Sequence, residues 1–419
     1  MVQYAPNFTG KRCRVVVQQM NVWIVNPFDN LPAEGYRPQR YWLMSKAFAA
    51  AGHDVVFWTS DFSHASKRKR EFVRECALPG VETRLVPTLP YPRNICLKRI
   101  TSHSRLAKDW ARMAGACGTK PDVVVASLPP LGLCRAAMRF AKSCGALFVA
   151  DIMDAWPETF GRIVPGFMLA PLKAVARSIY CGADAVSAVA ARYGELAKSY
   201  GATCPVKCCY HGIEVENGEE GSGKREAGVT SSCSFAEKRE TGSGAVKLVY
   251  IGAMGESYDL ETAIAAVKEM PGFTLDLAGS GPKEAALRAQ ASDRDRIRFH
   301  GYLRDDNLKA LLRSCDIALV PMFPDSCVGV PYKLADYAAA RLRVAECLGG
   351  ETQSLVERFG AGGHYEPRNV ASLKSRLAGL AVGPAEGWDA QGFVDEFDAS
   401  RIMSDYVSWV AALAEGKRS

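Results

Sequence analysis

The sequence predicts an α/β protein built from two doubly wound domains, each with a parallel sheet covered by helices on both faces. Short apolar runs alternate with segments of helical periodicity in both halves of the chain, which is typical of such sheets. A polar stretch rich in Gly, Ser, Glu and Lys interrupts this rhythm. The 419 residues, 48% of them hydrophobic, are enough to fill two cores.

The first domain is expected over residues 1–212. An apolar run starts at Asn21, helical spacing extends from Tyr36 to Ala51, and strand character returns after Gly52, which together predict a βαβ unit. Further apolar segments predict the rest of a parallel sheet. The predicted strand regions are Asn21–Asp29, Asp54–Phe62, Asp122–Ser127, Ala146–Ile152 and Ala183–Val189.

Residues 213–245 predict a flexible insertion or linker, because large apolar side chains are scarce there. Residues 246–385 resume the rhythm and predict a second Rossmann-like domain, and residues 386–419 predict a helical segment that packs back toward the first domain. We expect ligands in a central cleft at the carboxyl ends of the strands. The strand-to-turn segments of the second domain are Lys247–Gly255, Phe273–Gly281, Arg296–Tyr302 and Asp316–Met322.

The composition restricts the partners. A net charge of +7 is too weak to indicate nucleic-acid binding but suits an anionic substrate or an acidic membrane surface. The 14 cysteines lack paired metal-ligand spacing, so we interpret them as reduced thiols of a cytoplasmic protein. The N-terminal segment lacks the apolar core of a signal peptide and no run of about 18 apolar residues occurs, so any membrane contact is expected to be peripheral.

Three glycine-containing turns follow strands of the second domain and are candidates for binding phosphate. Glycine lets backbone N–H groups approach phosphate oxygens closely, although strand-to-helix turns also use glycine for geometry alone. None of the turns matches GxGxxG in full, which disfavours a nicotinamide-dependent dehydrogenase. The glycines are Gly252 and Gly255, Gly279 and Gly281, and Gly329.

The third turn carries a basic residue at a helix start. Pro331 suits the first helical position after Gly329 and Val330, and Lys333 then adds a full charge to the positive end of the helix dipole. A diphosphate would satisfy both the charge and the free N–H groups. The alternative is a surface ion pair between Lys333 and Asp336, three residues later on the same face.

These segments together resemble the retaining glycosyltransferases of family 4, which have the GT-B architecture. The resemblance covers nearly the whole chain and implies a UDP- or GDP-sugar donor bound by the second domain and a lipid-linked oligosaccharide or glycan acceptor bound by the first. It is strongest with enzymes of bacterial capsule, exopolysaccharide or O-antigen assembly. It rests on LVYIGAMGESYDLETAI, LDLAGSGP, IRFHGYL, CDIALVPMF and VGVPYKLADY, and on Arg40 with Gly52-His53, DVVVASLPPL, DIMDAWPETF and ADAVSAV.

The chain departs from the family pattern at two places. The second of two family glutamates, which contacts the donor ribose, aligns with Asp336, whereas the first, which helps hold the donor sugar, aligns with Val328. Whether Asp325 replaces that first acid stays open. The usual Gly-x-Pro after the helix is Arg341-Leu342-Arg343, which raises the alternative of a degenerate site.

The resemblance also implies roles in the reaction. Lys333 and the helix start would stabilise charge on the leaving diphosphate, whose own oxygen takes the acceptor proton in a same-face attack. Asp154 is the best acidic candidate in the first domain, with capping of the next segment as its alternative. No Asp-x-Asp strand end or His cluster suggests a metal, and we expect no cofactor besides the donor.

Other residues are candidates for the acceptor side and the donor end. Arg40 looks like a cleft residue that meets phosphate, or else a solvated helix-start arginine. Glu158 is a second acceptor candidate, Asp151 a weaker acid than Asp154, and Glu351 resembles a family position near the donor.

A basic run in the first domain suggests contact with the inner face of the plasma membrane, where a polyprenyl-diphosphate acceptor would be embedded, although a charge run is usually a solvated face. The run consists of Lys67, Arg68, Lys69 and Arg70, with Arg93, Lys98 and Arg99 farther on.

Two other functions stay open: a catalytically weak partner subunit that binds a nucleotide sugar or glycan, and a nucleotide-sugar epimerase.

Overall fold

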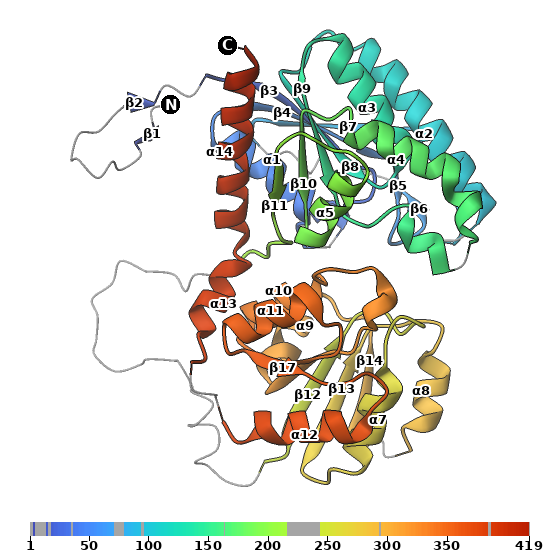
Figure 1. Cartoon of the computed structure of the whole chain (residues 1–419), viewed down its shortest axis with the longest axis vertical. Coiled ribbons are helices and arrows are strands. Elements are labelled where there is room, and N and C mark those ends of the chain that lie inside the picture. The colour runs from blue at the N-terminus through green and yellow to red at the C-terminus, as the bar shows by residue number, and fades with distance from the viewer. Residues whose placement is uncertain are drawn as a thin grey trace. The chain divides into compact units, whose positions relative to one another are not determined.

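The computed structural model contains two compact units (Figure 1). Unit 1 comprises Met1–Cys209 and Ser400–Ser419, and unit 2 comprises Tyr210–Ala399. The insertion expected over residues 213–245 lies almost entirely outside the described residues. The structure describes residues 3–4, 14–15, 18–34, 37–70, 79–93, 96–162, 164–215, 244–292, 295–383 and 387–418.

Unit 1 contains a seven-stranded sheet in the order β11-β10-β9-β8-β3-β4-β7. Every pairing in it is parallel, and β8 and β9 are buried along their whole length, as expected of a sheet covered on both faces. The strands are β3 (Asn21–Val25), β4 (Asp54–Ser60), β7 (Val81–Val86), β8 (Val123–Leu128), β9 (Leu147–Ile152), β10 (Ala185–Ala188) and β11 (Val206–Cys208).

Helices α2, α3 and α4 run side by side over one face of this sheet (Figure 1). Under them Trp23 stacks on Phe140 with ring centroids 5.2 Å apart, and Trp23, Trp58 and Trp110 are fully buried. The helices are α1 (Arg40–Ala50), α2 (Leu97–Gly115), α3 (Leu131–Ser143), α4 (Ala170–Tyr180), α5 (Ala191–Ser199) and α14 (Ala399–Arg418). Shorter elements are β1 (Gln3–Tyr4), β2 (Arg14–Val15), β5 (Phe62–Ser63), β6 (Arg68–Lys69), η1 (Pro32–Glu34), η2 (Glu158–Arg162) and η3 (Gly166–Leu169).

Unit 2 contains a six-stranded parallel sheet in the order β14-β13-β12-β15-β16-β17, so the predicted class of two α/β units with parallel sheets is confirmed. Its strands are β12 (Val246–Ile251), β13 (Phe273–Ala278), β14 (Ile297–Gly301), β15 (Ile317–Val320), β16 (Arg343–Glu346) and β17 (Gly362–His364). Its helices are α7 (Leu260–Lys268), α8 (Glu284–Gln290), α9 (Asp305–Arg313), η4 (Pro324–Ser326), α10 (Lys333–Ala339), α11 (Gly350–Arg358), α12 (Val370–Ala381) and α13 (Ala390–Glu396).

The turn after α10 keeps the geometry of a glycine turn without glycine. Arg341 has φ of 54°, and its N–H bonds to Ala338 O while the N–H of Leu342 bonds to Tyr337 O, which is a Schellman motif. Arg343 donates from Nη1 to the carbonyl of Leu380 in the last turn of α12 and to that of Gly383 just after it. Replacement of the family's Gly-x-Pro therefore leaves a regular helix end.

Two kinds of feature are absent among the residues that the structure describes. No helix among them is both long and apolar enough to cross a membrane. No group of three or more His, Cys, Asp or Glu side chains within the same described ranges is arranged to hold a metal ion.

Candidate functional site

The glycine turns of unit 2 are packed against one another at the carboxyl ends of β12 and β13. The N–H of Gly252 bonds to Ala278 O, and the N–H of Met254 bonds to Ser280 O. A Cβ at Gly279 would collide with the Gly252 carbonyl, and a Cβ at Gly281 would collide with that of Met254.

Close approach of two loops thus explains both Gly279 and Gly281. Gly252 has φ of 129°, and its N–H is already bonded to Ala278 O at the end of β13. Gly255 differs, because a Cβ there would meet no atom within 4 Å. Gly255 is therefore the glycine of this set whose position leaves room for a ligand.

Lys333 is the most unusual side chain of unit 2. It lies at the first position of α10 and is only 8% exposed, yet among the described residues its Nζ has no hydrogen-bond partner. Nζ lies 4.0 Å from the ring centroid of Tyr250 and 4.4 Å from that of Tyr258. A Cβ on Gly252 would come within 3.0 Å of it.

Burial holds the pKa of Lys333 well below its usual value, and the nearby carboxylate of Asp336 offsets only part of this effect. Asp336 itself is 4% exposed. The alternative of a solvated surface pair is therefore wrong, because neither side chain is at the surface. A buried cation that has no hydrogen-bond acceptor is stabilised when an anion binds to it.

The segment before α10 is fixed by its backbone. The carbonyl of Gly329 accepts a hydrogen bond of 2.8 Å from the Thr352 hydroxyl, and Val330 and Pro331 are buried. Asp325 lies in η4 with an exposed side chain, and Val328 is half-buried. Glu351, in the first turn of α11, accepts a hydrogen bond of 2.8 Å from the Tyr210 hydroxyl.

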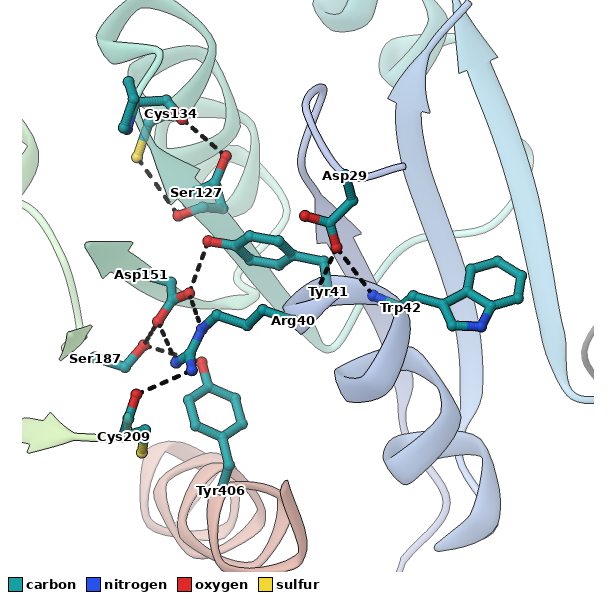
Figure 2. A network of polar contacts seen from close by, with 12 residues as sticks. Asp29, Arg40, Tyr41, Trp42, Ser127, Cys134, Asp151, Ser187, Cys209 and Tyr406 are labelled. Atoms are coloured by element: carbon teal, nitrogen blue, oxygen red, sulfur yellow. Dashed lines mark hydrogen bonds and ion pairs between the residues drawn. The ribbon is translucent and has the colours of Figure 1, made fainter. Parts of the chain in front are cut away.

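In unit 1 Arg40 occupies a position that contradicts its predicted contact with acceptor phosphate. It is 2% exposed, and its Nε and Nη2 donate to the two carboxylate oxygens of Asp151 at 2.8 and 2.9 Å (Figure 2). Its Nη1 donates to Cys209 O at 2.9 Å. Both the cleft role and the solvated alternative are wrong for this residue, because a bidentate buried pair occupies the guanidinium.

Both carboxylate oxygens of Asp151 also accept hydrogen bonds from residues other than Arg40. Asp151 accepts hydrogen bonds from the hydroxyls of Tyr41 at 2.7 Å and Ser187 at 2.5 Å, and Ser187 lies 3.1 Å from the hydroxyl of Tyr406 on α14 (Figure 2). Burial opposes its charge, but Arg40 and the two hydroxyls hold its pKa below the usual value. Asp151 therefore ties α1, β9, β10 and α14 together and is not available as the weaker alternative acid.

The two other candidates in unit 1 lie after β9. Asp154 accepts a hydrogen bond of 3.1 Å from the Thr159 hydroxyl, and burial raises its pKa. Glu158 Oε1 accepts from the Tyr200 hydroxyl and lies 3.9 Å from Lys173 Nζ, whereas Oε2 is buried without a partner in the part of the chain that the structure describes. Asp154 is thus hydrogen-bonded to the segment that follows β9, and its role at the acceptor stays a prediction.

The basic run is not one charged face. Arg70 is buried, donates to the carbonyls of Asp29 and Ser60, and pairs with Glu34 at 3.2 Å. Arg68 and Lys69 are exposed on β6.

Lys67 and Arg99 instead face a group of rings that sequence reasoning missed. We call His64, Lys67, Tyr91, Arg99, His103 and Trp156 the aromatic–basic cluster. The turn between β5 and β6, the loops after β7 and β9, and the start of α2 supply its members. The sequence offered one signal for this cluster. Several of its members follow predicted strands, and the loops that follow parallel strands meet at one edge of the sheet.

Two family models match the chain. A glycosyl transferase 4-like domain matches residues 38–206, and the glycosyl transferases group 1 model matches residues 245–381. No curated protein matches.

Solved structures agree with the fold at low identity. Sucrose-phosphate synthase from Thermosynechococcus elongatus has a TM-score of 0.72 at 14% identity, covering 95% of this chain and 100% of that one. Anabaena HepE in complex with UDP-glucose has a TM-score of 0.63 at 14% identity, covering 94% and 100%. The N-terminal domain of Candida albicans trehalose-6-phosphate phosphatase has a TM-score of 0.65 at 12% identity, covering 97% and 99%.

Proposed function

The chain is a glycosyltransferase of the GT-B architecture, and from this premise we propose that it is a retaining enzyme that transfers a sugar from a UDP- or GDP-sugar to a lipid-linked or glycan acceptor in surface polysaccharide biosynthesis. The donor binds to unit 2 and the acceptor to unit 1. The observation that carries the proposal is Lys333, a buried cation whose Nζ has no hydrogen-bond acceptor among the described residues.

Transfer of a sugar leaves negative charge on the departing diphosphate, and a preformed cation stabilises that charge without reorganisation. Lys333 is a candidate for this cation, because its Nζ lies next to Gly252 and over the rings of Tyr250 and Tyr258. The open backbone at Gly255 gives the phosphates room. The complex of Anabaena HepE with UDP-glucose supports a uridine nucleotide as the donor.

The donor sugar and ribose need polar groups beside the phosphate site. Asp336 is our candidate for the ribose contact, and Glu351 is our candidate at the donor end. Asp154, whose pKa is raised by burial, is proposed to orient the acceptor hydroxyl, while the leaving phosphate takes the proton. No metal ion and no cofactor besides the donor enter this proposal.

Calorimetric titration with UDP, GDP, ADP and their sugar conjugates tests the donor site. We expect one diphosphate to bind selectively and Lys333→Ala to weaken its binding by about 1–3 kcal/mol, the scale of a lost charge-assisted hydrogen bond. Lys374→Ala is the matched control, because Lys374 pairs with Glu269 on the surface of unit 2. Equal affinity in wild type and Lys333→Ala would remove Lys333 from the donor site.

Binding without transfer would instead favour the weak partner subunit, and an epimerised donor in the absence of acceptor would favour an epimerase. Incubation of the selected nucleotide sugar with and without a lipid-linked acceptor separates these outcomes. The anomeric configuration of the product, read by NMR, tests retention.

A peripheral membrane contact through unit 1 is part of the same proposal. Leu97 and Ile100 on the first turn of α2 are 81% and 65% exposed, beside the exposed Arg93 and Lys98. Apolar and cationic side chains together suit an anionic lipid surface. Vesicles containing anionic lipid should retain the wild type better than Leu97→Ser with Ile100→Ser, and equal retention would argue against this contact.

A further inference from the structure

The aromatic–basic cluster gathers four basic side chains into one part of unit 1. Lys67 Nζ donates to the carbonyl of His64 at 2.5 Å and lies 3.3 Å from its Nδ1. The Arg99 Nε donates to Nε2 of His103 at 3.4 Å. Two cations and two imidazoles thus meet although they come from separate loops and a helix.

Aromatic rings hold these groups in place. Arg99 Cζ lies 5.3 Å from the ring centroid of Trp156 and 5.8 Å from that of Tyr91, and Lys67 Nζ lies 5.2 Å from the ring of Tyr91. The ring of His103 lies 6.3 Å from that of Trp156. The Tyr91 hydroxyl lies 2.6 Å from Nδ1 of His64, so the rings and the bases form one contact network.

The electrostatics of the cluster are those of an anion site. Burial first, and then the charges of Lys67 and Arg99, together lower the pKa of His64 to about 4. Burial lowers the pKa of His103 to about 3, with Arg99 and His64 acting in the same direction. The pKa values of Lys67 and Arg99 are themselves lowered, by burial first.

The negative charge of Asp154 raises the pKa of Arg99 and so offsets part of the effect of burial. A bound oxyanion would lower the electrostatic cost of the two cations, Lys67 and Arg99, while the two neutral imidazoles have N–H groups that can donate to it. Lys67 also has φ of 58°, a left-handed conformation that costs free energy for a residue with a Cβ and occurs preferentially at ligand sites. The strain and the clustered charge therefore point to the same role.

We propose that the aromatic–basic cluster binds the phosphate or diphosphate group of the acceptor. Lys67 and Arg99 contact the oxyanion, the imidazole N–H groups donate to it, and the Trp156 ring packs against the adjoining apolar or sugar part. This inference rests on the proposed transfer to an acceptor in unit 1. It also places the anion beside Asp154, the candidate for orienting the acceptor hydroxyl.

The test measures binding of pyrophosphate, geranyl diphosphate and geraniol to the full chain carrying Lys333→Met, so that the donor site does not contribute. Lys67→Gln with Arg99→Gln should weaken binding of both diphosphates at least tenfold. Lys108→Gln with Arg139→Gln is the matched control, because both side chains are exposed on helices of unit 1 and the charge change is the same.

Comparison of the three ligands shows whether the anion belongs to a lipid headgroup or is a free oxyanion. Tighter binding of geranyl diphosphate than of pyrophosphate, with no binding of geraniol, identifies a lipid headgroup, and equal binding identifies a free oxyanion. Absence of diphosphate binding, or equal losses in the cluster and control variants, would overturn the proposal. If Lys67→Gln with Arg99→Gln does not fold, Arg99→Lys is measured in its place, with an expected smaller loss.

Nucleotide titration of the same cluster and control changes, made with Lys333 intact, separates this inference from the proposed function. Unchanged UDP or GDP binding with lost diphosphate binding supports both. Intact nucleotide binding with no cluster effect overturns the acceptor inference alone. No nucleotide binding in the wild type overturns the proposed function instead.

Discussion

Arg40 in unit 1 and Lys333 in unit 2 are both cations at the start of a helix, and both are almost fully buried at 2% and 8% exposure. Arg40 has a bidentate carboxylate and a carbonyl as partners, whereas Lys333 has two tyrosine rings and no hydrogen-bond acceptor among the described residues. Burial alone therefore does not identify a binding residue. The hydrogen bonds of the two cations distinguish them: those of Arg40 are made within the fold, whereas Lys333 keeps the donors that we propose bind a diphosphate.

The largest expected effect concerns the paired cation. Asp151→Asn leaves Arg40 buried without its counter-charge, so the free energy of unfolding of unit 1 should fall by about 3–5 kcal/mol. Urea unfolding followed by tryptophan fluorescence measures it, because Trp388 is the one tryptophan of the sequence outside unit 1. Glu195→Gln is the control and should cost below about 1 kcal/mol, since Glu195 and its partner Lys198 are both exposed.

The unpaired cation should respond in the opposite direction. Lys333→Met removes a buried charge and keeps most of the side-chain volume, so the nucleotide-free protein should gain about 1–2 kcal/mol in the free energy of unfolding of unit 2. Urea unfolding followed by circular dichroism, without nucleotide, measures this gain. A loss of stability would mean that the tyrosine rings already satisfy Lys333 and would weaken the comparison.

A pH titration sharpens the same contrast. The pKa of Lys333 is lowered by burial, and a bound diphosphate raises it, so nucleotide binding takes up a proton at pH values between the lowered and the raised pKa. Affinity should then fall as pH rises, by at most about 1.4 kcal/mol per pH unit. Calorimetry at pH 7.5–9 in buffers of different ionisation enthalpy measures this proton uptake as a difference in binding heat between buffers. The Lys333→Met variant should show no such difference.

The smallest effect concerns Arg341, a cation whose position is explained by backbone geometry. Its φ of 54° favours glycine, so Arg341→Gly should be about 1 kcal/mol more stable than Arg341→Ala. The alanine variant is the control because both variants lose the hydrogen bond from Arg341 to Gln391. Equal stabilities in thermal unfolding would show that the turn relaxes without strain.

The sequence predicted the fold well because buried parallel strands are nearly continuous apolar runs. The run that contains β8 and the helical spacing that ends at Gly52 are examples. The predicted helix from Tyr36 was too long, because α1 begins at Arg40 after extended backbone at Gln39. Boundaries depend on such backbone angles, which the apolar pattern does not report.

The site was predicted less completely. Lys333 was found because a lysine after Pro331 is unusual at the positive end of a helix. Arg40 was misinterpreted because its partner Asp151 is 111 residues away, and no local pattern announces that pairing. His64 and His103 were missed for the same reason, since single histidines acquire meaning only when the fold brings them together.

The position of helix α14 at the end of the sequence determines the order in which the two units can be completed during synthesis on the ribosome. The chain leaves unit 1 at Cys209 and returns at Ser400, so all of unit 2 is synthesised before Tyr406 can reach Ser187. Unit 2 is one continuous segment whose ends meet, with hydrogen bonds from Ile213 N to Phe397 O and from Ala399 N to Ile213 O. Because domains fold as units during synthesis, the half of the molecule translated first is the half completed last.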